Sequence, residues 1–297
     1  MMSTTMDFPF ERSRRAWLAW LCSSLAAGAA SSGARGAAPA LVPGELSEFR
    51  VELPAELREL AGQRGHPTPV THALVAVAAP PNFDAGREWP VLVVNATSDP
   101  GYSSSRQLLR AYRAAAAAAG WIIVAGDPEP AVSQADDQLM LRFALDLATL
   151  VALKPQWKDA GRARLAFAGF SGGAKYSGYL AALFRRQGAR LAGVYMAGVN
   201  QNAFGEAARQ FGILDDSLRE VPVFLQGGTR DRVATPAQHR AIESDLARDG
   251  FRHVRLEFVA GGHALDTTPL EDALRWFDAG RRDTPEPAGP AASSVVQ

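Results

Sequence analysis

The sequence predicts an α/β fold over residues 41–280, built on a mostly parallel eight-stranded sheet with helices on both faces. Three observations support this prediction. The chain has 297 residues, of which 47% are hydrophobic, so it can bury a large core. From Leu41 onward, short apolar or β-branched runs alternate with longer amphipathic segments. From Pro90 onward, most connections between the apolar runs are long enough to form helices.

The predicted strands are apolar or alternating runs of residues with turn residues between them. No helical pattern separates the first three runs, so we expect these three strands to form an antiparallel edge of the sheet. The eight runs span residues 48–53, 73–78, 90–95, 121–125, 164–168, 191–197, 221–225 and 253–259.

The predicted helices are the amphipathic segments between the later strands. Two of them begin with a Thr-Pro pair, in which Thr235 and Thr268 are expected to be N-caps. Gln238 and Glu271 follow at N3, where their side chains can complete a capping box. The five predicted helices span residues 104–119, 136–153, 172–186, 236–248 and 269–279.

Both ends of the chain are predicted to lie outside this domain. Residues 1–40 have the order of a secretory signal peptide: arginines, an apolar run over 16–30, and small residues at which cleavage is expected near positions 30–40. Arg14 and Arg15 resemble the twin-arginine export signal, although an ordinary signal peptide remains an alternative. The apolar run is too short to favour a stable membrane span. We therefore expect an exported, periplasmic or extracellular protein, with a disordered tail over 281–297.

Charge and cysteine content exclude several classes of function. The chain carries 31 basic and 31 acidic residues, so its formal net charge is zero and we expect no nucleic-acid partner. A single cysteine rules out an internal disulfide framework and a multi-cysteine metal centre. We therefore expect no cofactor, and chemistry that uses ordinary side chains.

The most specific motif is the segment Gly169-Phe170-Ser171-Gly172-Gly173, between a predicted strand and a predicted helix. A sharp turn of this kind needs small residues two positions on either side of the serine, and glycine occupies both. The turn would present the Ser171 hydroxyl at the sheet edge. It would also place the Gly172 amide at a helix N-terminus, where it can stabilise an oxyanion. A glycine-rich turn that only allows close packing is the alternative.

A serine nucleophile needs a base, and His263 is the best placed histidine. It follows the last predicted strand through Ala260-Gly261-Gly262, in a loop at the carboxyl end of the strand, where functional residues of parallel sheets gather. An ordinary loop histidine is the alternative. The other histidines are expected at early strands, on the surface or in packing positions; they are His66, His72, His239 and His253.

The base in turn needs a carboxylate to orient it, and Asp231 follows the seventh predicted strand at the same sheet edge. Asp127, after the fourth strand, is a weaker competitor. Asp266 is expected to cap the last helix, and Asp215 and Asp216 lie in a polar connection.

The chain order Ser171, Asp231, His263 is that of an α/β-hydrolase. Residues from about Val42 to Ala279 resemble an α/β-hydrolase of the secreted esterase or polyhydroxybutyrate-depolymerase-like kind, and Gly261-Gly262-His263 and the segment 273–277 resemble the end of that family's domain. The resemblance implies hydrolysis of carboxylic esters through an acyl-enzyme intermediate. In that reaction Ser171 would be the nucleophile, His263 the base and Asp231 the acid that orients it.

One departure from the family concerns the oxyanion hole. Members commonly carry His-Gly after the third strand, where this sequence has Asn95-Ala96-Thr97. The second oxyanion donor, beside Gly172, is therefore assigned to the Thr97 amide, with Ala96 as the alternative.

The segment between the sixth and seventh strands, residues 199–220, is too short for a large lid, so we expect an open site. An open site on an exported protein suits a small-molecule or polymeric ester. Two alternatives stay open: an exported peptidase or acyltransferase on the same fold, and a non-catalytic binding protein. The residues that could border the site are Tyr102, Phe170, Tyr176, Asn200, Asn202 and Phe204.

Overall fold

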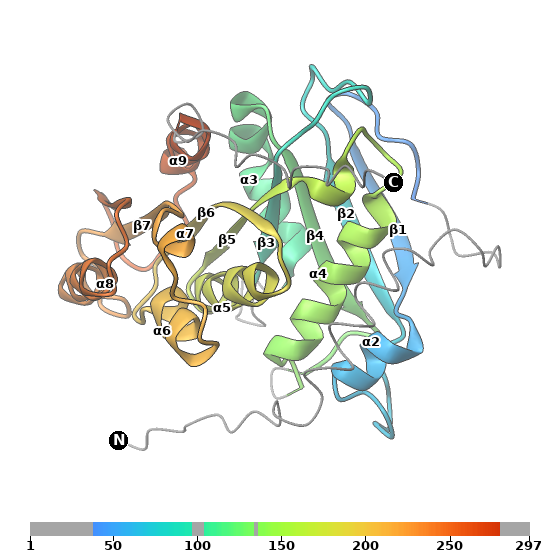
Figure 1. Ribbon diagram of the computed structural model, residues 1–297, viewed down its shortest axis with the longest axis horizontal. Helices are drawn as coiled ribbons and strands as arrows, with labels where there is room; N and C mark the ends of the chain where they lie inside the picture. The colour runs from blue at the N-terminus through green and yellow to red at the C-terminus, as the bar shows by residue number, and fades with distance from the viewer. Residues whose placement is uncertain (1–37, 97–103, 134–135, 280–297) are drawn as a thin grey trace, which may run out of the picture. The chain divides into compact units, whose positions relative to one another are not determined.

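The structure is a computed structural model that describes residues 38–96, 104–133 and 136–279 (Figure 1). Residues 1–37 of the predicted signal peptide, the tail over 281–297, Thr97 and Tyr102 lie outside these ranges. In the described ranges, no helix is both long and apolar enough to cross a bilayer.

The described residues contain an eight-stranded sheet with the strand order β1-β2-β4-β3-β5-β6-β7-β8. All eight predicted strands are present, and the six strands β4-β3-β5-β6-β7-β8 run parallel to one another. Their bounds are β1 Leu46–Glu52, β2 His72–Ala78, β3 Val91–Asn95, β4 Ile122–Glu129, β5 Arg164–Phe170, β6 Arg190–Ala197, β7 Val223–Gly228 and β8 Val254–Val259.

The predicted antiparallel edge is only partly correct. β1 pairs antiparallel with β2, and β2 pairs antiparallel with β4, so these two strands do form the edge. β3, however, lies inside the sheet and runs parallel to both β4 and β5. All five of its residues are buried, as expected of a strand covered on both faces. A short helix, α2 (Ala55–Leu60), also separates β1 from β2, which the sequence pattern did not predict.

The five predicted helices are present, and two of them have the predicted bounds. Thr235 caps α8 with a complete capping box that includes Gln238. The last helix begins at Thr268 itself, one residue earlier than expected. The bounds of these helices are α3 Ser105–Ala119, α4 Leu139–Leu153, α5 Gly172–Arg186, α8 Pro236–Arg248 and α9 Thr268–Ala279.

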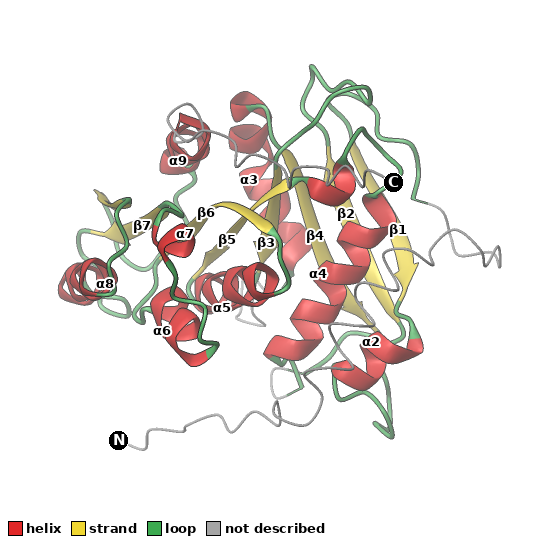
Figure 2. Cartoon of the chain, in the orientation of Figure 1, coloured by secondary structure: helices red, strands yellow, loops and turns green. Residues whose placement is uncertain are grey.

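The helices cover both faces of the sheet (Figure 2). α3 and α9 pack against each other on one face, while α4 and α5 pack against each other on the opposite face. Apolar side chains from α3, α9 and the sheet form one continuous buried cluster, in which Tyr112, Trp121 and Tyr195 are the largest members. Burial of such area is the main force that fixes the sheet between its helices.

The connection between β6 and β7 carries two short helices, α6 (Ala203–Gln210) and α7 (Asp216–Arg219). α6 packs against α5, and its Phe204 is fully buried against Phe251. The structure therefore has only short helices where a lid domain would be inserted, as the length of this segment predicts.

Candidate active site

Ser171 lies in a tight turn directly between β5 and α5. Its backbone has φ 54° and ψ −119°, a conformation that costs a non-glycine residue about 1–3 kcal/mol. Gly169 and Gly173 make the turn possible: a Cβ on Gly169 would lie 2.3 Å from the Gly173 carbonyl, and one on Gly173 would lie 2.3 Å from the Asn95 carbonyl oxygen. Both glycines are thus required, for the reason that the sequence motif indicates.

The sheet brings Ser171 together with the two residues predicted to act with it. Because β5, β7 and β8 are parallel, the residues that follow them meet at one edge of the sheet. His263 Nε2 lies 3.0 Å from Ser171 Oγ, and His263 Nδ1 lies 2.8 Å from Asp231 Oδ2. These distances are normal for hydrogen bonds, so the three side chains form one continuous hydrogen-bonded chain.

Asp231 is held by its own loop. Its Oδ1 atom accepts hydrogen bonds of 2.8 Å from the amides of both Val233 and Ala234, which leaves Oδ2 for His263. Only 1% of the Asp231 side chain is exposed. Burial raises the pKa of this carboxyl, but the hydrogen bonds from His263 and the two amides outweigh it, so the net pKa is lower than usual. Asp231 is therefore kept as a carboxylate.

The imidazole of His263 is held by close packing as well. The Phe170 ring lies 4.9 Å from the His263 ring, centre to centre. Gly198, which follows β6, has φ +59°, and a Cβ there would lie 2.8 Å from the Phe170 ring and 3.2 Å from His263 Cε1. Sequence reasoning missed Gly198; the available signal was a glycine directly after a strand, at the edge where the site forms.

Two loops that carry the site also touch each other. A Cβ on Gly228 would lie 2.4 Å from the Gly262 carbonyl oxygen, and the Arg230 amide donates to the Gly261 carbonyl at 2.7 Å. The loop after β7 is thereby fixed against the loop after β8, which sets the distance between Asp231 and His263.

Three of the other aspartates accept hydrogen bonds from amides at helix N-termini, and the fourth, Asp216, pairs with Arg219 within α7. The Asp127 carboxylate accepts from the Ser105 amide at the start of α3, Asp215 accepts from the Leu218 amide in α7, and Asp266 accepts from the Thr268 amide at 2.9 Å. These contacts occupy the carboxylates away from His263 and agree with the capping role expected for Asp266.

The remaining histidines lie elsewhere. His239 is buried in α8 and its Nδ1 lies 3.1 Å from the Thr235 carbonyl oxygen, while His253 pairs with Glu220 on the surface. His66 lies 3.8 Å from Asp136, and His72 contacts Thr71.

The residues expected to border the site divide into two groups. Phe170 contacts His263, and the exposed Asn200 donates to the Val233 carbonyl at 3.4 Å, near Asp231. Asn202, in contrast, is buried and caps α6, and Phe204 belongs to the core. The Tyr176 hydroxyl donates to the Asp137 carbonyl.

The structure describes one side of the predicted oxyanion hole. Gly172 is the first residue of α5, where backbone amides have no partner within the helix. The Ala96 amide donates to Ser105 Oγ at 3.1 Å, which commits the alternative second donor to another partner.

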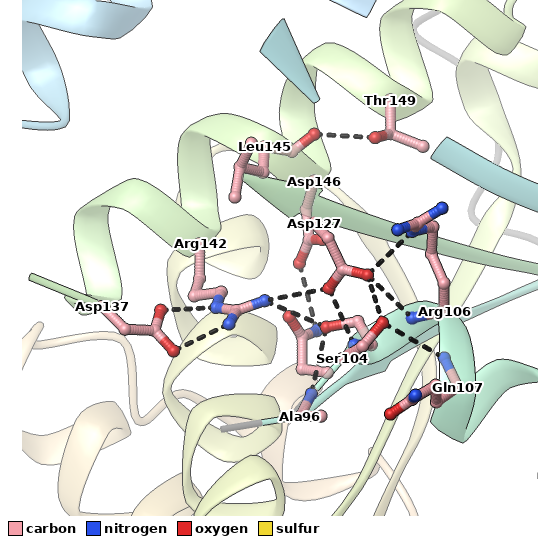
Figure 3. Close-up of polar contacts among 12 residues, drawn as sticks. Ala96, Ser104, Arg106, Gln107, Asp127, Asp137, Arg142, Leu145, Asp146 and Thr149 are labelled. Atoms are coloured by element: carbon pink, nitrogen blue, oxygen red, sulfur yellow. Dashed lines mark hydrogen bonds and ion pairs between the residues drawn. The ribbon is translucent and has the colours of Figure 1, made fainter. Parts of the chain in front are cut away.

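Next to Ala96 lies a buried polar cluster that the sequence analysis did not single out (Figure 3). Arg142 and Asp146, on the apolar helix α4, are each only 2% exposed. Burial lowers the pKa of Arg142, but hydrogen bonding and the charges of Asp137, Asp127 and Asp146 raise it above its usual value. Burial also raises the pKa of Asp146 to about 7. In the sequence, this cluster was indicated by two charged residues four positions apart in an otherwise apolar helix, because charged residues are rarely buried without partners.

In the described part of the chain, no group of three or more histidine, cysteine, aspartate or glutamate side chains is arranged to hold a metal ion.

No protein-family model matches the sequence, and no curated protein matches it. Solved structures do match. An α/β serine hydrolase without a lid from Xanthomonas campestris is 19% identical, with a TM-score of 0.52 over 84% of this chain and 99% of its own. The chain has the α/β-hydrolase fold.

Two further solved structures resemble this fold with similar TM-scores. A carbohydrate esterase from gut microbiota is 11% identical, with a TM-score of 0.52 over 70% of this chain and 91% of its own. A candidate dipeptidyl aminopeptidase IV from Bacteroides ovatus is 13% identical, with a TM-score of 0.53 over 80% of this chain and 36% of its own. This chain therefore spans about a third of the Bacteroides protein. The likeness shows the fold, and a fold by itself specifies neither activity nor substrate.

Proposed function

We propose that this protein is an exported serine esterase that cleaves carboxylic esters with Ser171, His263 and Asp231. The observation that carries the proposal is the hydrogen-bonded chain from Ser171 Oγ through both ring nitrogens of His263 to Asp231 Oδ2. It starts at a serine in a strained turn directly before a helix, an arrangement that exposes the serine hydroxyl at the sheet edge, where the histidine can act as its base.

In the proposed reaction, Asp231 accepts a hydrogen bond from Nδ1–H of His263 and thereby leaves Nε2 unprotonated. Nε2 removes the proton of Ser171 as Oγ attacks the ester carbonyl carbon. The negative charge that develops on the carbonyl oxygen is stabilised by the Gly172 amide, at the N-terminus of α5, and by the Thr97 amide. His263 then gives the proton to the departing alcohol, leaving an acyl group on Ser171.

The second half of the reaction reverses these steps with water. His263 accepts a proton from water as the water oxygen attacks the acyl carbon, and then returns the proton to Ser171 Oγ as the carboxylic acid leaves. Asp231 stays ionised throughout, in accord with its lowered pKa.

The comparisons support the chemistry at the level of the fold. One similar structure is a serine hydrolase and another is a carbohydrate esterase, and the connection between β6 and β7 carries only the short helices α6 and α7. The polyhydroxybutyrate-depolymerase-like subtype and export through residues 1–40 remain parts of the proposal that rest on the sequence.

The test is labelling with a serine-directed fluorophosphonate, followed by mass spectrometry to locate the adduct. We expect the adduct on Ser171 and hydrolysis of p-nitrophenyl butyrate, both lost in Ser171→Ala. Ser244→Ala is the control, because Ser244 is exposed on α8 and its hydroxyl donates to the Arg240 carbonyl within the same helix. A folded protein without an adduct and without ester hydrolysis would favour a binding protein. A peptide p-nitroanilide assayed in parallel separates an esterase from a peptidase.

A further inference from the structure

The end of β3 lies directly against the nucleophile turn. Asn95, the last residue of β3, is paired with Gly169 of β5. Its carbonyl oxygen fills the space that a side chain on Gly173 would need, at 2.3 Å from the Cβ position. A shift of this strand end would therefore act on the first turn of α5, which carries the Gly172 amide, and on Ser171 just before it.

Polar side chains hold this strand end at two adjacent points. The Ala96 amide donates to Ser105 Oγ at 3.1 Å, and Asn95 Nδ2 donates to Asp146 Oδ2 at 3.1 Å. Ser105, Asn95 and Asp146 are all buried. The end of β3 is thus held from α3, where Ser105 contacts the Ala96 backbone, and from α4, where Asp146 contacts the Asn95 side chain.

Ser105 is itself fixed by a charged group. Arg142 Nη1 donates to Ser105 Oγ at 3.0 Å. The other guanidinium nitrogens of Arg142 donate to both oxygens of Asp137, at 2.6 and 2.7 Å (Figure 3). A bidentate pair of this kind holds the guanidinium in one orientation. Asp137 also accepts from Tyr176 of α5 through its carbonyl oxygen, so the arrangement connects α3, α4 and the nucleophile helix.

Stability alone is a weak reason for such a cluster. Buried ion pairs lose their hydration, and replacing a whole pair with apolar side chains is often neutral or stabilising. The cluster instead contacts the end of β3, which packs against Gly173. A small displacement of this strand end would alter the geometry of the nucleophile turn.

We propose that Ser105, oriented by Arg142, is a positioning residue for ester hydrolysis: it holds Ala96 so that the end of β3 keeps the nucleophile turn in its reactive geometry. This inference rests on the proposed function. Ser104, the residue before Ser105, is the N-cap of α3. The Ser105 hydroxyl is therefore not needed to cap the helix, and it accepts from Ala96 and Arg142 instead.

The experiment compares Ser105→Ala with Thr149→Val. Thr149 is a matched control because it is 1% exposed, lies on α4 with Arg142, and its hydroxyl donates to the Leu145 carbonyl within that helix. In Ser105→Ala we expect kcat to fall by about 10- to 100-fold with KM within about twofold, the pattern for loss of geometry needed in the transition state. In Thr149→Val we expect kcat to stay within about twofold of wild type.

Three comparisons distinguish a failure of the proposed function from a failure of the positioning role. Wild-type labelling at Ser171 and ester hydrolysis are checked first, and their absence would overturn the proposed function itself. With an active wild type, equal kcat values for Ser105→Ala and Thr149→Val would overturn the positioning role alone. Ser105→Cys serves if Ser105→Ala does not fold: it keeps the shape but offers a weaker acceptor, so its kcat should also fall, and an unchanged kcat would overturn the inference.

Discussion

Replacement of Asp231 by asparagine is the sharpest test of the proposed site, because the two oxygens of this carboxylate have separate tasks. Oδ1 accepts from the amides of Val233 and Ala234, and Oδ2 accepts from His263. An asparagine can keep its oxygen toward the two amides. The NH2 group of the asparagine then points its hydrogens at His263 Nδ1. Nδ1 must accept this hydrogen bond, so the single proton of the neutral imidazole is on Nε2. A protonated Nε2 cannot accept the proton of Ser171.

If the proposed site is catalytic, the expected loss in kcat is on the order of 10⁴, the cost of replacing the acid of a Ser-His-Asp triad by its amide. That factor corresponds to about 5.4 kcal/mol in the activation free energy. Stability should change much less, by about 1–2 kcal/mol, because the loop hydrogen bonds persist in neutral form. The folded fraction at the assay temperature therefore stays high, and the loss of activity reports on the imidazole.

The assay is saturating turnover of p-nitrophenyl butyrate, with a thermal melt of the same samples. Asp266→Asn is the matched control, since Asp266 accepts from the Thr268 amide and hydroxyl and an asparagine oxygen can do the same. We expect Asp266→Asn to retain most of the activity. A dead Asp266→Asn beside an active Asp231→Asn would refute the assignment of the acid.

Three other predictions follow from particular contacts and from the N-terminal sequence. Gly198→Ala should lower kcat by about tenfold or more, because the added Cβ would displace Phe170 and His263; turnover within twofold of wild type would contradict this packing role. Asp146→Asn should stabilise the protein increasingly as pH rises from 4 to 8. Folded Asp146, with a pKa of about 7, holds a proton that the unfolded chain, near 3.8, releases, so wild-type stability falls across that window; a rise of about three in pKa corresponds to at most about 4 kcal/mol. Urea unfolding of both proteins at pH 4.5 and pH 8 measures this, and a constant difference would be the contrary result. N-terminal sequencing of exported protein should find a first residue between positions 29 and 40, whereas a chain that still begins near Met1 would indicate an anchor.

Local sequence patterns determined most of the elements. Apolar runs and amphipathic segments located all eight strands and five of the helices, because hydrophobic period and capping residues act within a few positions of the chain. Gly169 and Gly173 indicated the strained turn at Ser171 for the same reason: the steric demand of the turn is local, and glycine meets it. The order of strands carrying Ser171, Asp231 and His263 was also readable, since parallel strands end at one edge.

The position of β3 was not determined by local pattern. Its apolar run fits an edge strand or a central strand equally well, and only its pairing with β4 and β5 decided between them. The short helices α2, α6 and α7 were missed because segments of four to eight residues carry little periodic signal and form through packing.

The polar cluster around Arg142 depended entirely on the tertiary structure. Ser105, Asp127, Asp137 and Asp146 come from three different elements, or from a loop, and the sequence does not show that they meet a buried guanidinium. The same holds for Gly198, whose close approach to Phe170 and His263 exists only once β6 lies beside β5. The sequence determined which residue types stand at the sheet edge; the distances between them, and therefore the chemistry they can perform, were decided by how the strands and helices pack.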